Sequence, residues 1–263
     1  MRDIQPYTFE GAKQQWAKPP VDNVGYLNSE DLLAKPDKEL KDLIAVFEHN
    51  RFDLAGWRNY QDKWRTLLGF GSITGKTIMD FGCGVGLESL LYTQQGNKVF
   101  AVDISPVNLK LAQHVAGVHG VMLEGAALCS DNAPYFPTPL FPIDVFHANG
   151  VLHHTPRFRE ILLRVCDVLS SDGWIQLMLY SDKGWEWATG NMPKPRTKAM
   201  GHPDFDRFVT AFDGVGFYAD WFSEDKINWL VGDFLELVSF DYVTRSIEKG
   251  WQDLYSIVKL RPR

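Results

Sequence analysis

The stretch 76-KTIMDFGCGVGLESLLYTQQGNKVFAVD-103 decides the fold of this chain. It begins with a short apolar run, residues 76–81, and continues through a glycine loop. Residues 87–95 then have helical spacing and end before Gly96, and residues 98–103 form a second apolar run. The order strand, glycine loop, helix, strand predicts the first unit of a parallel α/β sheet.

Helix-capping residues extend this pattern beyond the second strand. In residues 105–117, Ser105 fits an N-cap, Pro106 fits the first helical position and Gly117 fits a C-cap. Three more strands and a second capped helix are predicted from the same alternation. The strands are residues 121–125, 143–148 and 174–180, and the helix starts behind Thr155 and Pro156.

The whole pattern predicts a Rossmann-like, doubly wound, seven-stranded sheet that is mostly parallel and has an antiparallel last strand. A helix from Ser223 and a pair of final strands, residues 234–243 and 253–260, complete it. We expect an N-terminal helical extension over residues 1–71 and a cofactor-binding domain over 72–263. We also expect a substrate lid in the loop-rich insertion, residues 181–222.

Composition narrows the class of protein. The 263 residues are 45% hydrophobic and 23% charged, as in ordinary globular proteins, and the net charge of -6 argues against nucleic acid as a partner. No window is apolar enough to span a membrane, and MRDIQPYTFE lacks a leader-like stretch, so we expect a cytoplasmic protein without a membrane partner. Cys83, Cys129 and Cys166 form no CxxC pair, so no zinc site or disulfide framework is predicted.

The glycine loop with its flanking acids predicts a cofactor site. Glycines at 82, 84 and 86 let backbone N–H groups approach a ligand, and Asp103 ends the second strand, where ribose hydroxyls bind. Asp80 would repel a pyrophosphate but attract an ammonium or a sulfonium. Leu87 stands where a dinucleotide fingerprint needs its third glycine, and the glycine loop lacks the Lys-Ser/Thr pair that a P-loop needs.

From residue 76 to 180 the chain resembles the class I S-adenosylmethionine-dependent methyltransferases, especially their small-molecule branch. The stretches that carry the resemblance are IMDFGCGVGLES, VFAVDISP, NGVLHHTP and VLSSDGWIQLMLY.

The resemblance implies S-adenosylmethionine as the cofactor and a role for each matching position. Gly82, Cys83 and Gly84 would pass close to the methionine moiety, and Asp80 would help to place its ammonium. Asp103 would accept hydrogen bonds from both ribose hydroxyls. The remaining implied contacts are Ile104 and the backbone of Gly125 and Ala126 at the adenine, with Asn149 and Gly150 also near the cofactor.

The paired histidines of 148-ANGVLHHTP-156 follow the fourth strand. Neighbouring side chains point in different directions, and no HExxH spacing is present, so we predict no metal site. His154 can face the acceptor, and we take it as the candidate general base, with His153 as a structural residue. Further candidates follow the fifth strand: Asp182 and Glu186 as secondary polar groups, and Trp185 and Trp187 as substrate-lining residues.

The leading hypothesis is transfer of a methyl group to a small organic acceptor by in-line displacement. Three alternatives stay open: a protein or RNA methyltransferase, an NAD-dependent oxidoreductase, and a cofactor-binding module without catalysis. The acidic charge and the sequence ANGVLHH, in place of NPPY, disfavour a flipped base as the acceptor. The acceptor, its nucleophilic atom and the oligomeric state stay open at this point.

Overall fold

The structure is a computed structural model that describes residues 8–16, 27–130, 135–212, 218–247 and 250–263. The glycine loop, every candidate site residue and both paired histidines lie within these ranges. Parts of the predicted N-terminal extension and of the predicted insertion lie outside them.

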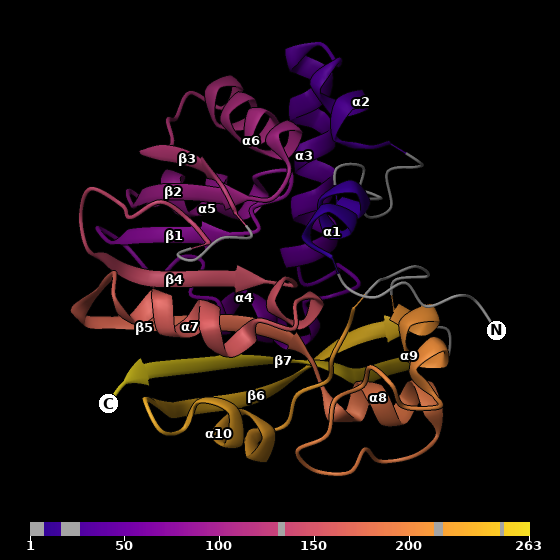
Figure 1. The fold of residues 1–263 in the computed structure, drawn as a ribbon. Coiled ribbons are helices and arrows are strands. Elements are labelled where there is room, and N and C mark those ends of the chain that lie inside the picture. Colours follow the sequence, from indigo (N-terminus) through magenta and orange to yellow (C-terminus); the bar gives the residue numbers. More distant parts are fainter. Residues whose placement is uncertain (1–7, 17–26, 131–134, 213–217, 248–249) are drawn as a thin grey trace.

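Seven strands form one sheet in the order β3-β2-β1-β4-β5-β7-β6 (Figure 1). Strands β1 to β5 pair in parallel, and β7 lies antiparallel between β5 and β6. The predicted Rossmann-like architecture is therefore confirmed, including its antiparallel strand. The strands are β1 (Thr77–Phe81), β2 (Lys98–Asp103), β3 (Gly125–Leu128), β4 (Ile143–Asn149), β5 (Leu169–Tyr180), β6 (Leu235–Ile247) and β7 (Gly250–Pro262).

Helices cover both faces of the sheet because alternate strand residues point to opposite sides. In β1, Ile78 belongs to a core with α5 and α6, whereas Met79 belongs to a core with α7 and α10. Figure 1 shows α7 and α10 in front of the sheet and α5 behind it. The helices that follow β1 are α5 (Leu87–Gln94), α6 (Pro106–Val118), α7 (Phe158–Cys166), α8 (Asp182–Thr189), α9 (Phe205–Phe212) and α10 (Glu224–Val231).

The N-terminal extension is helical, as predicted, and packs on the sheet. Trp64 is fully buried, and its ring meets that of Tyr255 on β7 at 5.5 Å, edge to face. The chain before β1 therefore belongs to the same core as the last strand. Its elements are α1 (Phe9–Trp16), α2 (Ser29–Leu33), α3 (Asp37–Phe52), the 3₁₀ turn η1 (Tyr60–Asp62) and α4 (Lys63–Leu67).

The third strand was predicted four residues too early. Residues 121–124 precede it, with Met122 86% exposed, and β3 begins where Gly125 pairs with Phe100. β3 is an edge strand in which every second residue is exposed, so it lacks a continuous apolar run of its own. The apolar residues just before it were therefore mistaken for the strand.

Two predicted helix ends also need correction. Ser105 caps α6 as expected, but the helix runs through Gly117, and Gly120 takes the left-handed backbone conformation with φ +75°. Thr155 does not cap a helix. Its hydroxyl accepts a hydrogen bond from the Arg157 N–H within a turn, and the preceding residues form the 3₁₀ turn η2 (Leu152–His154).

The searched part of the chain, which is limited to the described residues, contains no helix with the length and apolarity needed to span a bilayer.

Candidate active site

A cavity of about 350 Å³ opens where the parallel strands end. Its lining combines the glycine loop, the ends of β2, β4 and β5, the helix α1, and residues of the β6–β7 hairpin. In Figure 1 the arrow of β4 points toward α1 and α9. Open α/β sheets bind ligands at this edge, so the cavity is the candidate active site.

The glycine loop supplies a backbone surface at one end of the cavity. Gly82 and Gly84 line it with φ of +79° and +54°. A Cβ at Gly82 would collide with the Val151 side chain, whereas a Cβ at Gly84 would meet no atom within 4 Å. Gly84 therefore leaves open space that a ligand can use. Cys83 is buried beside them, and burial raises the pKa of its thiol, as expected for a small loop residue rather than a reactive thiolate.

Asp103 also faces this end of the cavity. Its carboxylate accepts hydrogen bonds from Gly84 N at 2.9 Å, Ser105 N at 2.8 Å and Asn108 Nδ2 at 3.1 Å. A carboxylate has about four acceptor positions, so capacity remains for a ligand hydroxyl. Ile104 follows it and lines the cavity as well.

Asp80 lies behind the glycine loop and does not line the cavity. Its Oδ2 accepts a hydrogen bond from the Ser89 hydroxyl at 2.5 Å. Burial raises the pKa of Asp80 to about 6, although the nearby His147 opposes the shift. From this position Asp80 can act on a ligand through its charge or through the glycine loop.

A buried pair that sequence reasoning missed lies next to the loop. Glu88 lines the cavity, and its Oε2 lies 2.7 Å from Nε2 of His147 on β4. Its Oε1 accepts a hydrogen bond from Asn149 Nδ2 at 2.5 Å. Burial opposes ionisation of Glu88, but the hydrogen bond and charge of His147, with Arg51 and Arg58, lower its net pKa. Glu88 follows Gly86 by two residues, so an acid at the helix N-terminus was a usable signal.

Asn149 presents an unused acceptor at the same place. Its Oδ1 is buried and has no hydrogen-bond partner among the described residues. Gly150, which follows it, also lines the cavity and has φ +80°. The structure therefore brings Asn149 and Gly150 to the same cavity as the glycine loop.

Asp80, Glu88 and His147 offer ligand-type atoms within 4.8 Å of one another. Those atoms already form hydrogen bonds with each other, with Ser89 and with Asn149. Because these atoms already have partners within the described part of the chain, the prediction that the protein has no metal site is kept.

Gly125 and Ala126 do not line the cavity, contrary to the expected adenine contact. They begin β3, whereas the cavity lies where the parallel strands end. Cys129 and Ser130 follow the strand and line the cavity instead. This placement follows from the later start of the third strand.

Both paired histidines lie at the cavity, in different settings. His153 is 1% exposed and stacks on Tyr180 with ring centroids 3.7 Å apart. Burial, with the adjacent His154, lowers its pKa well below the usual value, so it stays neutral. His154 is half-buried; its Nδ1 lies 3.2 Å from the Tyr218 carbonyl oxygen, and its ring lies 4.8 Å from that of Trp16.

The cover of the cavity comes more from α1 than from the insertion. Phe9, Ala12 and Trp16 of α1 line the cavity, and Phe212 is the residue that the described part of the insertion contributes. The other candidates after β5 do not line it. These are Trp185, buried against His202 and Phe208, Trp187, 39% exposed, and Asp182 and Glu186.

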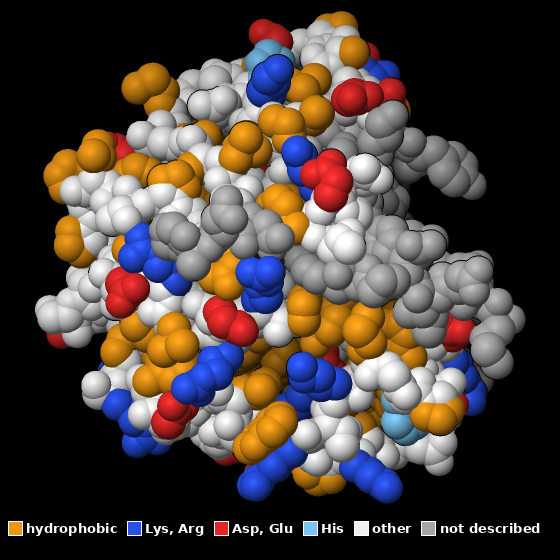
Figure 2. Space-filling view, viewed as in Figure 1, with side chains coloured by type: hydrophobic (Ala, Val, Ile, Leu, Met, Phe, Trp, Pro, Cys, Tyr) orange, Lys and Arg blue, Asp and Glu red, His pale blue; other side chains and the backbone are white. Residues whose placement is uncertain are grey.

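Basic residues outnumber acidic ones around the cavity. Among the described residues, its lining holds four arginines, Arg51, Arg58, Arg157 and Arg245, and two acids, Glu88 and Asp103. Figure 2 shows basic and hydrophobic side chains side by side across the middle of one face.

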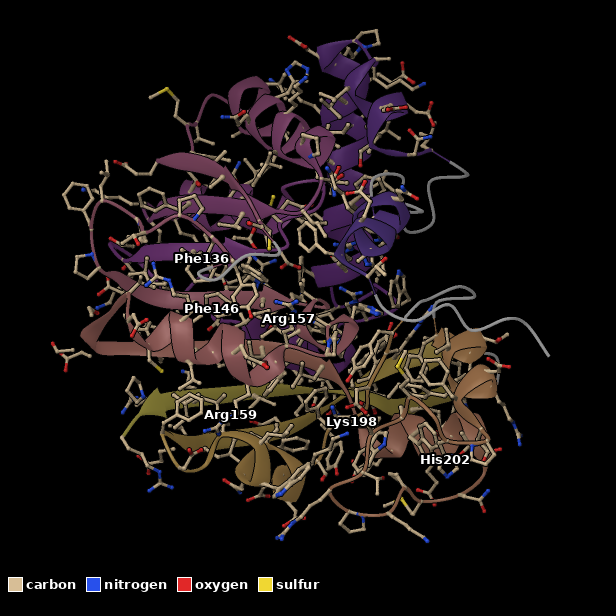
Figure 3. All side chains as sticks on the ribbon, viewed as in Figure 1. Phe136, Phe146, Arg157, Arg159, Lys198 and His202 are labelled. Atoms are coloured by element: carbon tan, nitrogen blue, oxygen red, sulfur yellow. The ribbon has the colours of Figure 1, made fainter. Side chains whose placement is uncertain are left out.

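One of these arginines, Arg157, is labelled in Figure 3. It lies near the centre of the molecule, whereas Arg159 lies toward α10. There Arg159 forms an ion pair with Asp233 at 2.6 Å, away from the cavity lining. Two arginines that are close in sequence therefore have different surroundings.

Comparison with known proteins agrees with this geometry. Residues 47–231 match a family model described as a methyltransferase domain. The chain belongs to this methyltransferase family. It is a class I, S-adenosylmethionine-dependent methyltransferase by family and fold, which confirms the resemblance inferred from its motifs.

Individual relatives are distant. A ubiquinone biosynthesis O-methyltransferase from Bordetella avium (strain 197N) is 26% identical over 110 residues, which is 40% of this chain and 43% of that protein. A malonyl-[acyl-carrier protein] O-methyltransferase from Serratia marcescens is 34% identical over 64 residues, 24% of this chain and 25% of that protein. The matched segments thus span less than half the length of these curated relatives.

A solved structure of a SAM-dependent methyltransferase from Aquifex aeolicus superimposes with a TM-score of 0.52 at 14% identity. The match covers 86% of this chain and 98% of that one. At this identity the likeness shows the shared fold.

Proposed function

We propose that this methyltransferase transfers a methyl group from S-adenosylmethionine to a small organic acceptor. The observation that carries the proposal is one cavity whose lining combines two unlike sets of residues: the glycine loop with Asp103, and His154 with aromatic side chains. S-adenosylmethionine, when bound, supplies an electrophilic methyl group on its sulfonium. The protein has to align an acceptor atom with that group and exclude water.

The residues around the glycine loop fit this cofactor. Gly84 leaves space for the methionine moiety beside Gly82 and Cys83, and Asn149 Oδ1 offers an unused acceptor for its ammonium. The positive charges of Arg51 and Arg58 help to lower the pKa of Glu88, and Asn149 donates a hydrogen bond to the same carboxylate. We therefore assign Arg51 and Arg58 to the cofactor carboxylate, because the ammonium and the carboxylate share one carbon atom.

The nucleoside part fits the neighbouring residues. We assign Asp103 to the ribose hydroxyls and Ile104 to packing on the adenine. Cys129 and Ser130 replace Gly125 and Ala126 as adenine contacts in the proposal, because they line the cavity and the other two do not. Gly150 stays as a backbone contact.

His154 is the proposed general base. Its Nδ1–H can donate to the Tyr218 carbonyl at 3.2 Å, which places the basic lone pair on Nε2. Bound S-adenosylmethionine would supply the methyl group, and Nε2 would take the proton that the acceptor atom loses. A carboxylate, thiolate or carbon nucleophile would need less of this assistance.

A small acceptor is favoured by the size and cover of the cavity. About 350 Å³ is near the lower end for small-molecule sites, and α1 covers it from one side. We propose that residues 1–71 form a cap and that residues 181–222 complete the cover through Phe212.

Thermal unfolding with separate ligands tests the cofactor assignment. We expect S-adenosylmethionine and its demethylated product to raise the melting temperature, with a stabilisation of about 2.7 kcal/mol at 100 times the Kd, and NAD to leave it unchanged. Asp103→Ala should remove most of the shift, whereas Asp241→Ala, outside the cavity lining, should retain it.

Two outcomes would contradict the proposal. Stabilisation by NAD alone would favour an oxidoreductase, and an unchanged shift in Asp103→Ala would place the ribose elsewhere. Methyl transfer itself is tested with isotopically labelled S-adenosylmethionine and a mixture of small phenols and acids, followed by mass spectrometry of the products.

A further inference from the structure

We infer that the acceptor is a small aromatic compound with a carboxylate on the side of the ring opposite its nucleophile, and that Arg245 binds this carboxylate. The inference deepens the proposed function and rests on it. It concerns the part of the cavity lined by the β6–β7 hairpin and by the aromatic residues near His154.

Arg245 is held at the cavity wall by neutral partners. It lies on β6, its Nη1 donates a hydrogen bond to the Tyr255 hydroxyl at 2.9 Å, and its guanidinium carbon is 4.5 Å from the centre of the Trp57 ring. Among the described residues it forms no ion pair with a carboxylate. A cation at a cavity wall without a protein counter-ion favours an anionic ligand.

A second cation shares the same indole. The guanidinium carbon of Arg58 lies 4.9 Å from the centre of the Trp57 ring, so two like charges lie close to one aromatic side chain. Their repulsion is reduced when anions bind beside them. The Trp57 Nε1–H is buried and has no partner among the described residues, which adds a hydrogen-bond donor at this wall.

The charge of the cavity contrasts with that of the whole protein. The chain has a net charge of -6, yet four arginines line the cavity in its described part. Of the two acids there, Glu88 is paired with His147, and Asp103 is assigned to the ribose. With Arg51 and Arg58 assigned to the cofactor carboxylate, Arg245 stays available for an anion on the acceptor.

Aromatic side chains connect Arg245 to the proposed base. Tyr180 lies 5.8 Å from Tyr255, 4.4 Å from Phe212 and 5.5 Å from His154, between ring centroids. All four residues line the cavity. Tyr180 is itself 6% exposed and stacked on His153, so an acceptor ring can pack against the edge of this aromatic wall, with its nucleophile toward His154 and its carboxylate toward Arg245.

Binding of two matched probes to the protein saturated with S-adenosylhomocysteine tests this inference. The probes are para-hydroxybenzoate and the uncharged para-hydroxybenzamide, and titration calorimetry measures both Kd values. We expect the carboxylate to bind roughly tenfold more tightly or better, because a charged hydrogen bond replaces a neutral one. The preference should disappear in Arg245→Gln and fall to an intermediate value in Arg245→Lys, which retains the charge without the planar fork.

Arg261→Gln is the matched control. It removes an equal charge from the same hairpin at an exposed position outside the cavity lining, and the preference should persist. S-adenosylhomocysteine binding to each variant verifies its fold. With that binding intact, equal affinity for both probes, no binding of either, or a preference retained in Arg245→Gln would overturn the inference and leave the cofactor assignment standing. Loss of S-adenosylhomocysteine binding by the unmodified chain would instead refute the proposed function.

Discussion

At the scale of single residues, the two adjacent histidines differ in what they can do. His153 is buried and stacked on Tyr180, so it holds an aromatic wall in place. His154 carries a hydrogen bond on Nδ1 and lines the cavity. The difference comes from the 3₁₀ turn η2, which directs neighbouring side chains to different surroundings.

We expect His154→Ala to lower kcat by about 10² to 10⁴, the usual contribution of a general base, while the Kd of S-adenosylhomocysteine stays unchanged. Single-turnover kinetics with an identified acceptor would measure this. His114→Ala, a half-exposed position on α6 outside the cavity lining, is the control. Full turnover in His154→Ala would contradict the role of His154 as general base and leave both histidines with structural roles.

The buried Glu88–His147 pair predicts a pH effect. Burial alone would lower the pKa of His147, but the hydrogen bond and charge of Glu88 raise it above its usual 6.5. This raised pKa contributes stability that is fully present below about pH 6.5 and is lost as the pH rises through the folded-state pKa. In Glu88→Gln, burial should dominate, so the pKa of His147 should fall and this pH-dependent stability should disappear.

An NMR titration of the His147 ring, with melting temperatures on both sides of pH 6.5, checks the sign of this effect. Thr93→Ala, which removes a hydrogen bond to the Ser89 carbonyl within α5 and touches neither Glu88 nor His147, is the control for general changes in packing. An unchanged His147 pKa in Glu88→Gln would show that the contact does not set it.

Sequence reasoning found the residues that the backbone itself dictates. Gly82, Gly84 and Asp103 follow from loop geometry and strand ends, and the structure brings them to one cavity. Glu88 was missed although it follows the glycine loop, because its partner His147 lies far away in sequence, and Arg245 was missed because its place depends on packing between remote segments. Arg245 lies on β6, remote in sequence from the glycine loop.

At the scale of elements, the insertion is fixed by a buried ion pair. Lys226 Nζ on α10 lies 2.8 Å from Asp220 Oδ1, and both side chains are almost inaccessible. Asp220 Oδ1 also accepts hydrogen bonds from Ala199 N and Trp221 N. Its own N–H donates to the His153 carbonyl, so the pair also supports the turn that carries the paired histidines.

We expect Lys226→Met to destabilise the fold by about 3–5 kcal/mol, because it leaves a buried carboxylate without its counter-charge. Adding Asp220→Asn should recover part of that loss. Urea unfolding measures both, and Arg196→Gln, which breaks an exposed ion pair with Asp225, should change stability little. A small effect of Lys226→Met would show that water or relaxation compensates the charge.

Interior elements were easier to predict than edge elements. β1, β2 and β4 are buried on both faces and have apolar runs that coincide with their bounds. β3 lies at the edge, where half of its residues are exposed, so its pattern did not mark its start. The same shift displaced the expected adenine contacts by several residues.

At the scale of the whole molecule, the parallel arrangement of β1 to β5 follows from the alternation of strands and helices and from the crossover rule. The composition of the cavity wall does not, because it combines α1, the loop after α3, the end of α9 and the β6–β7 hairpin. Only the assembled fold brings these segments together around the ends of the central strands.

The position of β7 has a consequence for how the protein is made. The last strand in sequence lies between β5 and β6, and it carries Tyr255, which holds Arg245 at the cavity wall. A nascent chain synthesised up to β6 therefore still lacks the strand that joins β6 to the rest of the sheet. During translation, the part of the cavity around the glycine loop and Asp103 can assemble first. The wall that contains Arg245 and Tyr255 must wait until residues 250–262 have left the ribosome.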